Sequence, residues 1–180
     1  MSSVIWFTGL SGAGKTTISR LLELNIAKNF LLDGSIIRLD GDVLRSGLSQ
    51  DLGFSATDRS ENIRRTAELA SLLFSLNHIV IVALISPVAS DRRRARQIIE
   101  SNAGRFIEIY VDTSLEVAER RDVKGLYRRA RKGELKEFTG IDSPYEIPVN
   151  PELKVSTKGK TPQESADQVI EYLKVERIIS

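Results

Sequence analysis

The clearest potential for chemistry lies in a glycine-rich octet near the start of the sequence, between an apolar run at 4–8 and a helix-like stretch. The octet consists of Gly9, Leu10, Ser11, Gly12, Ala13, Gly14, Lys15 and Thr16, and Thr17 follows it. It fills every position of the pattern GxxxxGK[ST], in which glycines let backbone N–H groups turn inward around phosphate oxygens and the helix start adds a favourable dipole. A nucleoside triphosphate site is therefore predicted; the alternative is a glycine-rich turn that contains a lysine by chance.

Two side chains of this loop have specific roles in phosphate chemistry. Lys15 is expected to reach the β and γ phosphates, and the Thr16 hydroxyl to bind Mg²⁺. The loop alone does not distinguish a kinase from a GTPase or an ATPase. A GTPase also needs an NKxD motif, which the sequence lacks, and its one DxxG, at 122–125, follows a predicted helix. A chance match explains that DxxG better.

A second candidate is the Asp40, Gly41, Asp42 turn at the end of the second predicted strand. Open parallel sheets bind ligands at the carboxyl ends of their strands, which would place these carboxylates near the phosphates. Asp40 would then orient an acceptor hydroxyl, accept its proton late in the reaction, and hold Mg²⁺ through water. An ordinary Asp-Gly turn accounts for the spacing equally well.

A third candidate is a basic stretch, because eight of the seventeen residues at 120–136 are Lys or Arg. Alone, such a stretch would be a solvated or nucleic-acid-binding helix. In a chain that also contains a phosphate loop, the stretch predicts a hinged cationic lid at about 120–146, which excludes water and stabilises the transition state. The other basic run, formed by Arg92, Arg93, Arg94 and Arg96, has no such context and is expected to be a solvated face.

The elements that must hold these residues can be predicted from apolar runs that alternate with helical patterns. Strands are predicted at 4–8, 35–39, 79–85 and 106–111, and helices from 15, at about 57–76, at about 91–101 and from about 114. Strands rich in Val and Ile with little alternation are typical of parallel strands buried on both faces. An α/β fold is predicted, with a mostly parallel sheet covered by helices on both faces and a loop at 139–151.

Two helix starts are encoded locally. Thr113 with Glu116 predicts a capping box after the fourth strand. Thr161, Pro162 and Glu164 predict a cap, a first-turn proline and a box acid for a final helix that ends at about residue 175.

Composition limits the remaining classes of protein. The chain has 180 residues, which suits one domain over 1–180, and a net charge of +2. It has no cysteine and one histidine, His78, so disulfides, thiolate metal sites and histidine metal sites are not expected. Its longest apolar run, at 79–85, is far shorter than the roughly 20 residues that a membrane-spanning helix needs. The N-terminus does not resemble a signal peptide, and a cytoplasmic location is expected.

Four blocks of the sequence closely resemble the adenylyl-sulfate kinase family. They are VIWFTGLSGAGKTT at 4–17, LDGDVLRSGLSQDLGFSATDRSENIRR at 39–65, ISP at 85–87 and RDVKGLYRRARKGELKEFTGIDSPYE at 121–146. The second and fourth blocks are far more specific than the phosphate loop. The resemblance implies a P-loop NTPase fold and transfer of the γ-phosphoryl group of MgATP to the ribose 3′-hydroxyl of adenylyl sulfate.

The same resemblance assigns roles to individual positions. It gives Asp40 the role of receiving the 3′-hydroxyl proton, with Lys15 at the phosphates, and it implies that an adenylyl sulfate site is formed by Asp42, Arg45, Phe54, Arg59, Asn62, Ile85, Ser86, Lys124 and Phe138. Guanidinium groups suit a phosphosulfate dianion. Phe54 and Phe138 would sandwich the adenine, although the sequence alone favours core positions for both. Ser86 has three possible roles: contact at the acceptor wall, the end of a strand, or a phosphoserine intermediate, for which no neighbouring base is apparent.

The resemblance also implies a homodimer and a possible functional link to ATP sulfurylase, with ATP and Mg²⁺ as cofactors and with neither nucleic acid nor membrane as a partner. Two alternatives stay open. One is a related P-loop kinase that acts on gluconate, shikimate or a nucleoside monophosphate. The other is a non-catalytic nucleotide- or nucleic-acid-binding module that uses the basic stretch as its binding surface.

Overall fold

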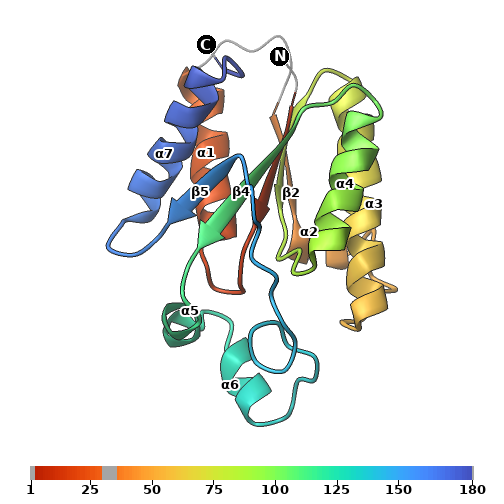
Figure 1. The fold of residues 1–180 in the computed structure, drawn as a ribbon, viewed down its shortest axis with the longest axis vertical. Helices are drawn as coiled ribbons and strands as arrows, with labels where there is room; N and C mark the ends of the chain where they lie inside the picture. The colour runs from red at the N-terminus through yellow and green to blue at the C-terminus, as the bar shows by residue number, and fades with distance from the viewer. Residues whose placement is uncertain (1–2, 30–35, 180) are drawn as a thin grey trace.

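The computed structural model describes residues 3–29 and 36–179, in which five strands alternate with seven helices (Figure 1). In chain order they are β1 Val4–Thr8, α1 Lys15–Asn29, β2 Ile36–Asp40, α2 Gly41–Arg45, α3 Ala56–Ser75, β3 Ile79–Ala83, α4 Ala89–Glu100, β4 Phe106–Asp112, α5 Leu115–Arg121, α6 Leu126–Arg131, β5 Leu153–Ser156 and α7 Pro162–Val175. None of the described helices is long and apolar enough to cross a bilayer.

The strands form one sheet in the order β2-β3-β1-β4-β5, with every pair parallel. The predicted α/β fold with a parallel sheet is confirmed. Because the strands are parallel, the loops that follow β1, β2, β3 and β4 all leave the sheet at its carboxyl edge. The phosphate loop therefore lies beside Asp40 and beside the segment that follows β3.

Helices cover both faces of the sheet, as the sequence predicts (Figure 1). Successive side chains of β1 point to opposite faces of the sheet. Ile5 and Phe7 pack with α1 and α7, whereas Val4 and Trp6 pack with α3 and α4. All four of these side chains are fully buried. The central strand is thus clamped between two apolar layers, which fixes the position of the loop that it leads into.

The helices α5 and α6 lie apart from these layers, beyond the carboxyl edge of the sheet (Figure 1). The predicted lid at 120–146 contains α6 and only the last two residues of α5, and residues 139–151 form the predicted loop without a helix or a named strand. The short helices α2 and α6 and the edge strand β5 have no counterpart in the prediction. The predicted strand at 35–39 corresponds to β2, although residue 35 lies outside the described residues.

The capping box predicted at Thr113 is wrong, because α5 starts from the next residue. Ser114 is the N-cap, and its hydroxyl accepts a hydrogen bond from the Val117 backbone at 3.4 Å. The Thr113 hydroxyl is buried and lies 3.1 Å from the Ala13 carbonyl and 2.6 Å from the Thr157 hydroxyl. By contrast, the capping box of α7, with Thr161 and Glu164, is confirmed.

The expectation that the arginine run of α4 is a solvated face is wrong for two of its four members. Arg92 is only 4% exposed, and its Nε lies 2.8 Å from the Oε1 of Glu108 on β4. Arg96 is partly buried and forms an ion pair with Glu152 at 2.7 Å. Arg93 and Arg94 are exposed, as predicted. A buried guanidinium needs a partner charge, and β4 supplies it.

Candidate functional site

A cavity of about 940 Å³ opens at the carboxyl edge of the sheet, between the phosphate loop, α2, α3, the segment after β3 and the lid. Nearly all of the residues predicted for the site line it: Ser11, Gly12, Ala13, Gly14, Lys15, Thr16, Thr17, Asp40, Asp42, Arg45, Phe54, Arg59, Asn62, Ile85, Ser86, Lys124 and Phe138. Gly9 and Leu10 do not line it. Leu10 lines a neighbouring hollow beside β4. One cavity therefore contains both the residues predicted to bind the nucleoside triphosphate and those predicted to bind the acceptor.

The phosphate loop has the backbone conformation that its glycines allow. Gly9 has a φ of +148°, and a Cβ there would lie 2.7 Å from the Val111 carbonyl oxygen. Gly12 has a φ of +72°, and its Cβ would lie 3.0 Å from the Ala118 carbonyl oxygen. Glycine is thus required at both positions by conformation and by space. The loop leads directly into α1, so the amide groups of the first turn face the cavity side of the loop.

Lys15 is 8% exposed, and its ammonium group donates hydrogen bonds to the carbonyls of Gly9 at 2.9 Å and Leu10 at 2.8 Å. Burial lowers the pKa of Lys15 to about 7, and the nearby carboxylate of Asp40 opposes this effect only in part. An anion that binds beside such a lysine raises its pKa again. Phosphate groups beside it would favour the charged form.

Asp40 lies at the centre of a small polar cluster and is 6% exposed. Its Oδ2 accepts a hydrogen bond from the Thr16 hydroxyl at 2.8 Å and forms an ion pair with Arg38 at 3.2 Å. Its Oδ1 accepts a hydrogen bond from the Asp42 backbone at 3.1 Å, which makes Asp40 the N-cap of α2. The carboxylate is therefore held in a fixed orientation at the floor of the cavity.

The donor set around Thr16 and Asp40 fits Mg²⁺. Both side chains offer oxygen atoms, and in the part of the chain that the structure describes no group of three or more His, Cys, Asp or Glu could hold a metal by itself. Mg²⁺ is usually held by one or two protein oxygens together with phosphate oxygens and water. A site of this kind depends on the nucleotide for its remaining ligands.

The opposite side of the cavity carries two guanidinium groups and an amide. Arg45 lies over the Phe54 ring at 4.5 Å and donates a hydrogen bond to the Gly53 carbonyl at 2.7 Å. Arg59 donates to the Thr139 hydroxyl at 2.6 Å. Burial lowers the pKa of Arg45, and the charge of Arg59 lowers it further. The two guanidinium groups repel each other in this cavity, and a bound anion would relieve the repulsion.

Asn62 completes this side of the cavity. It is 4% exposed, and its Oδ1 has no hydrogen-bond partner among the residues that the structure describes. A buried amide oxygen without a partner is costly. Its position in the cavity wall suits contact with a ligand that carries a hydrogen-bond donor.

Neither phenylalanine of the site is a core residue. Phe54 is 63% exposed. Phe138 is partly buried and packs edge to face against Tyr127, with the ring centroids 5.0 Å apart. The expectation from sequence alone that both belong to the core is therefore wrong, because both rings point into the cavity region instead of an apolar layer. Both are available for contact with a ligand.

The lid is attached to the phosphate loop by backbone carbonyls of that loop. Arg121 donates to the Gly12 and Ala13 carbonyls at 3.3 and 3.2 Å, and the Tyr127 hydroxyl donates to the Ser11 carbonyl at 2.9 Å. The Asp122 carboxylate accepts hydrogen bonds from two backbone amides at the start of α6, each at 3.0 Å. Lys124 forms an ion pair with Asp42 across the cavity. Nothing local in the sequence distinguishes Tyr127 as a residue of the site.

Of the eight basic residues at 120–136, four line the cavity and two form ion pairs with α5 instead. Arg121, Lys124, Arg129 and Lys136 line the cavity. Arg120 and Arg131 instead form ion pairs with the α5 residues Glu116 and Glu119, at 4.0 and 2.8 Å. Only part of the positive charge is thus directed at a ligand.

A model of the adenylylsulphate kinase family matches residues 1–156. This chain belongs to that family. Among curated relatives, the adenylyl-sulfate kinase of Staphylococcus haemolyticus is 51% identical over 178 residues, which cover 99% of this chain and 87% of the relative. The adenylyl-sulfate kinase of Saccharomyces cerevisiae is 52% identical over 176 residues, which cover 97% and 85%.

A solved structure supports the same membership. The APS kinase CysC of Mycobacterium tuberculosis, in complex with AMPPNP and APS, superposes with a TM-score of 0.91 at 45% identity, with 96% of this chain and 98% of that chain covered. Both the fold and the length of this adenylylsulphate kinase family member therefore agree with those of a relative that binds both ligands.

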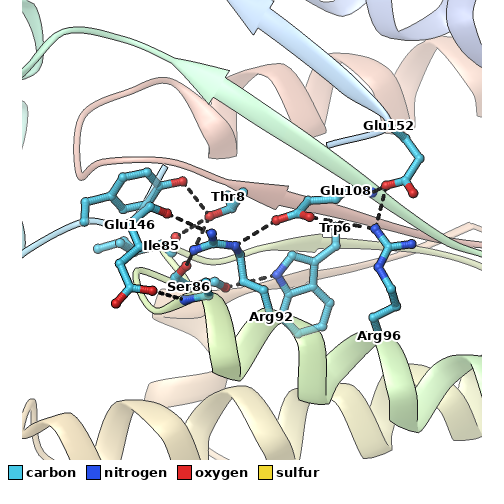
Figure 2. Close-up of polar contacts among 11 residues, drawn as sticks. Trp6, Thr8, Ile85, Ser86, Arg92, Arg96, Glu108, Glu146 and Glu152 are labelled. Carbon is cyan, nitrogen blue, oxygen red and sulfur yellow. Dashed lines mark hydrogen bonds and ion pairs between the residues drawn. The ribbon is translucent and has the colours of Figure 1, made fainter. Parts of the chain in front are cut away.

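In this family member, the segment after β3 forms one wall of the cavity. Ser86 has a φ of +45°, is 2% exposed, and its hydroxyl accepts a hydrogen bond from the Trp6 indole at 3.0 Å (Figure 2). The Thr8 hydroxyl donates to the Ile85 carbonyl at 2.7 Å. No basic side chain is among the described hydrogen-bond partners of the Ser86 hydroxyl. These contacts suit a structural role in the wall better than a nucleophilic one.

Arg92, which contacts this wall, is a second residue that was not predicted for the site. It follows the same helical face as Ala95 and Ile99, all three of which are buried. Spacing of three and seven residues from two core positions is a signal that the sequence does contain. The charged neighbours of Arg92 suggest a solvated helix, and they hide this spacing signal.

Proposed function

We propose that this protein is an adenylyl-sulfate kinase, which transfers the γ-phosphoryl group of MgATP to the ribose 3′-hydroxyl of adenylyl sulfate and releases ADP and 3′-phosphoadenylyl sulfate. The observation that supports this most strongly is that one cavity is lined by a phosphate loop, by Asp40 and by a pair of guanidinium groups, in a member of this family. ATP as the donor also agrees with the AMPPNP bound to the relative from M. tuberculosis.

On the donor side, backbone amides of the loop and the ammonium group of Lys15 would hold the β and γ phosphates. The Thr16 hydroxyl and, through water, the Asp40 carboxylate would hold Mg²⁺, which neutralises charge on those phosphates when bound. Lys15 already lies against the loop, where its Nζ donates to the Gly9 and Leu10 carbonyls, and it would exchange these acceptors for phosphate oxygens.

On the acceptor side, Arg45, Arg59 and the Nδ2 group of Asn62 would donate hydrogen bonds to the phosphosulfate oxygens, with Asp42 and Lys124 at the edge of the same pocket. Phe54 and Phe138 would hold the adenine between their rings. Ile85 and Ser86 would form the wall behind the ribose. These contacts would place the 3′-oxygen in line with the γ phosphorus, which is most of what phosphoryl transfer requires.

In the transfer itself, a bond forms between the 3′-oxygen and the γ phosphorus while the bond from that phosphorus to the β–γ bridging oxygen breaks. Asp40 orients the hydroxyl and takes its proton late, since the transition state is loose. The cations of the lid would stabilise the negative charge on the transferring group and keep water out. No covalent intermediate on Ser86 is needed.

By the same family resemblance, we propose that the chain forms a homodimer and works with an ATP sulfurylase that supplies adenylyl sulfate. A reaction that uses ATP also favours the cytoplasm as its location. Light scattering of the purified protein tests the dimer.

The direct test of the proposed function incubates the protein with MgATP and adenylyl sulfate. We expect ADP and 3′-phosphoadenylyl sulfate in equal amounts, separated by ion-exchange chromatography and identified by ³¹P NMR. Parallel reactions contain gluconate, shikimate or a nucleoside monophosphate instead. ADP that appears with one of these acceptors, and not with adenylyl sulfate, would show that the acceptor is wrong.

A further inference from the structure

Arg92 contacts three segments that are far apart in the sequence and meet beside the cavity. Its Nη1 donates to the Ser86 carbonyl at 2.8 Å, its Nη2 donates to the Glu146 carbonyl at 2.8 Å, and its Nε lies 2.8 Å from Glu108. Figure 2 shows the guanidinium between these partners. Arg92 itself does not line the cavity. It therefore touches the wall and the end of the lid without touching the space for substrates.

Glu146 ties the end of the lid to the same place. Its backbone amide donates to the Pro87 carbonyl at 2.8 Å, and its carboxylate accepts a hydrogen bond from the Ala89 amide at 2.7 Å. Val88, the N-cap residue of α4, provides no side-chain hydrogen bond. Glu146 thus caps α4, the helix that carries Arg92. The end of the lid, the wall and α4 all contact one another.

The wall needs this support because its backbone is strained. Ser86 is in the left-handed region with a φ of +45°, which costs free energy for a residue with a Cβ. Surrounding contacts must fix such a conformation. Trp6 holds the hydroxyl of Ser86 and Arg92 holds its carbonyl, at 3.0 and 2.8 Å.

We propose that Arg92 is a positioning residue, which acts through Ser86 and Glu146 to keep the acceptor wall and the end of the lid in one fixed arrangement. This proposal rests on the proposed function, in which the wall and the lid enclose adenylyl sulfate. Loss of Arg92 should weaken binding of the acceptor and leave the phosphate loop intact.

A simpler role for Arg92 is to neutralise the buried carboxylate of Glu108. Burial raises the pKa of Glu108, and the charges of Arg92 and Arg96 oppose that rise. The double variant Arg92→Met with Glu108→Gln separates the two roles, because it removes the guanidinium together with the carboxylate that needs it. Arg92→Lys is the conservative variant: it keeps a charge for Glu108 but cannot bridge both carbonyls.

Arg96→Met is the matched control. Arg96 lies one turn further along α4 and pairs with Glu152 at 2.7 Å and with Glu108 at 3.8 Å, but it contacts neither Ser86 nor Glu146. Its loss should lower the melting temperature without any specific effect on the acceptor.

We expect the double variant and Arg92→Lys to raise the KM for adenylyl sulfate about tenfold or more, since the first loses both charge-assisted hydrogen bonds and the second loses the bridge between the two carbonyls, and to change the KM for MgATP by less than about twofold. Arg96→Met should change both values by less than about twofold. The proposal is overturned if the double variant has the KM of the unmodified protein for adenylyl sulfate, or if Arg96→Met raises that KM equally.

Hydrogen exchange gives a second readout that needs no substrate. The amides of Glu146 and Ala89 should exchange faster in the double variant and in Arg92→Lys than in the unmodified protein or in Arg96→Met. Unchanged exchange would overturn the proposal. If the unmodified protein does not phosphorylate adenylyl sulfate, the proposed function fails, and the exchange rates still decide whether Arg92 holds the wall and the lid together.

Discussion

Asp40 shows how one carboxylate can serve several neighbours. It caps α2, accepts a hydrogen bond from Thr16 and pairs with Arg38. Asparagine caps helices about as well as aspartate, so the variant Asp40→Asn should keep the fold and the shape of the cavity floor. What it loses is the ability to take a proton and the negative charge.

We therefore expect Asp40→Asn to lower kcat by about 10²- to 10⁴-fold, the usual contribution of a general base, while the Kd for an ATP analogue changes by much less. Steady-state kinetics and equilibrium titration measure the two quantities. Asp51→Asn is the control, since Asp51 pairs with Arg65 outside the cavity. An unchanged kcat in Asp40→Asn would show that Asp40 is not the general base.

Lys15 provides a prediction about pH. Its pKa is lowered to about 7 by burial, so above pH 7 it is largely neutral in the unliganded protein. Phosphate groups favour the charged form, so the pKa must rise when nucleotide binds. Binding then takes up a proton, and affinity for MgATP should be constant below pH 7 and fall as the pH rises above 7, by at most about tenfold per pH unit.

Titration calorimetry at pH 8 in two buffers with different heats of ionisation measures this proton uptake. The uptake should persist in Lys124→Arg, which replaces another lysine of the cavity, and should disappear in Lys15→Arg. Binding at pH 8 without proton uptake by the unmodified protein would contradict the assignment.

The lid is fixed to the phosphate loop by few contacts, so single substitutions can loosen it. Tyr127→Phe removes the hydrogen bond to the Ser11 carbonyl but keeps the ring against Phe138. One such bond contributes about 1 kcal/mol, or roughly a fivefold change in an equilibrium. We expect the KM values of both substrates to rise about three- to tenfold, because in the proposed function the lid would cover both.

Tyr172→Phe is the matched control for this substitution, since Tyr172 lies on α7 and does not line the cavity. It should leave both KM values unchanged. An unchanged KM for both substrates in Tyr127→Phe would mean that the bond between the lid and the phosphate loop does not contribute to binding.

For the molecule as a whole, the sequence was sufficient for several features whose signal is local. The phosphate loop, the alternation of strands and helices, and the cap of α7 each depend on neighbouring residues. The strand β5 was missed because only Val155 of its four residues is buried, so its apolar pattern is too weak to recognise. The helices α2 and α6 are one or two turns long and carry no periodic pattern.

The remaining errors come from contacts between distant parts of the chain. Arg92 is buried because Glu108, on another element, pairs with it, and nothing in the run of arginines shows this partner. Thr113 lost its expected cap because its hydroxyl contacts Ala13 and Thr157. The gathering of the predicted site residues around one cavity follows from the parallel sheet, whereas the catalytic and binding roles of those residues stay predictions.

The hydrogen bond between Trp6 and Ser86 has a practical consequence. Trp6 is the only tryptophan in the chain, its ring is fully buried, and its indole donates a hydrogen bond to the Ser86 hydroxyl in the cavity wall. The protein thus contains an intrinsic fluorophore in contact with this wall. Any shift in its ultraviolet emission reports on the surroundings of one tryptophan, so a change in the wall can be sought optically without attaching a dye.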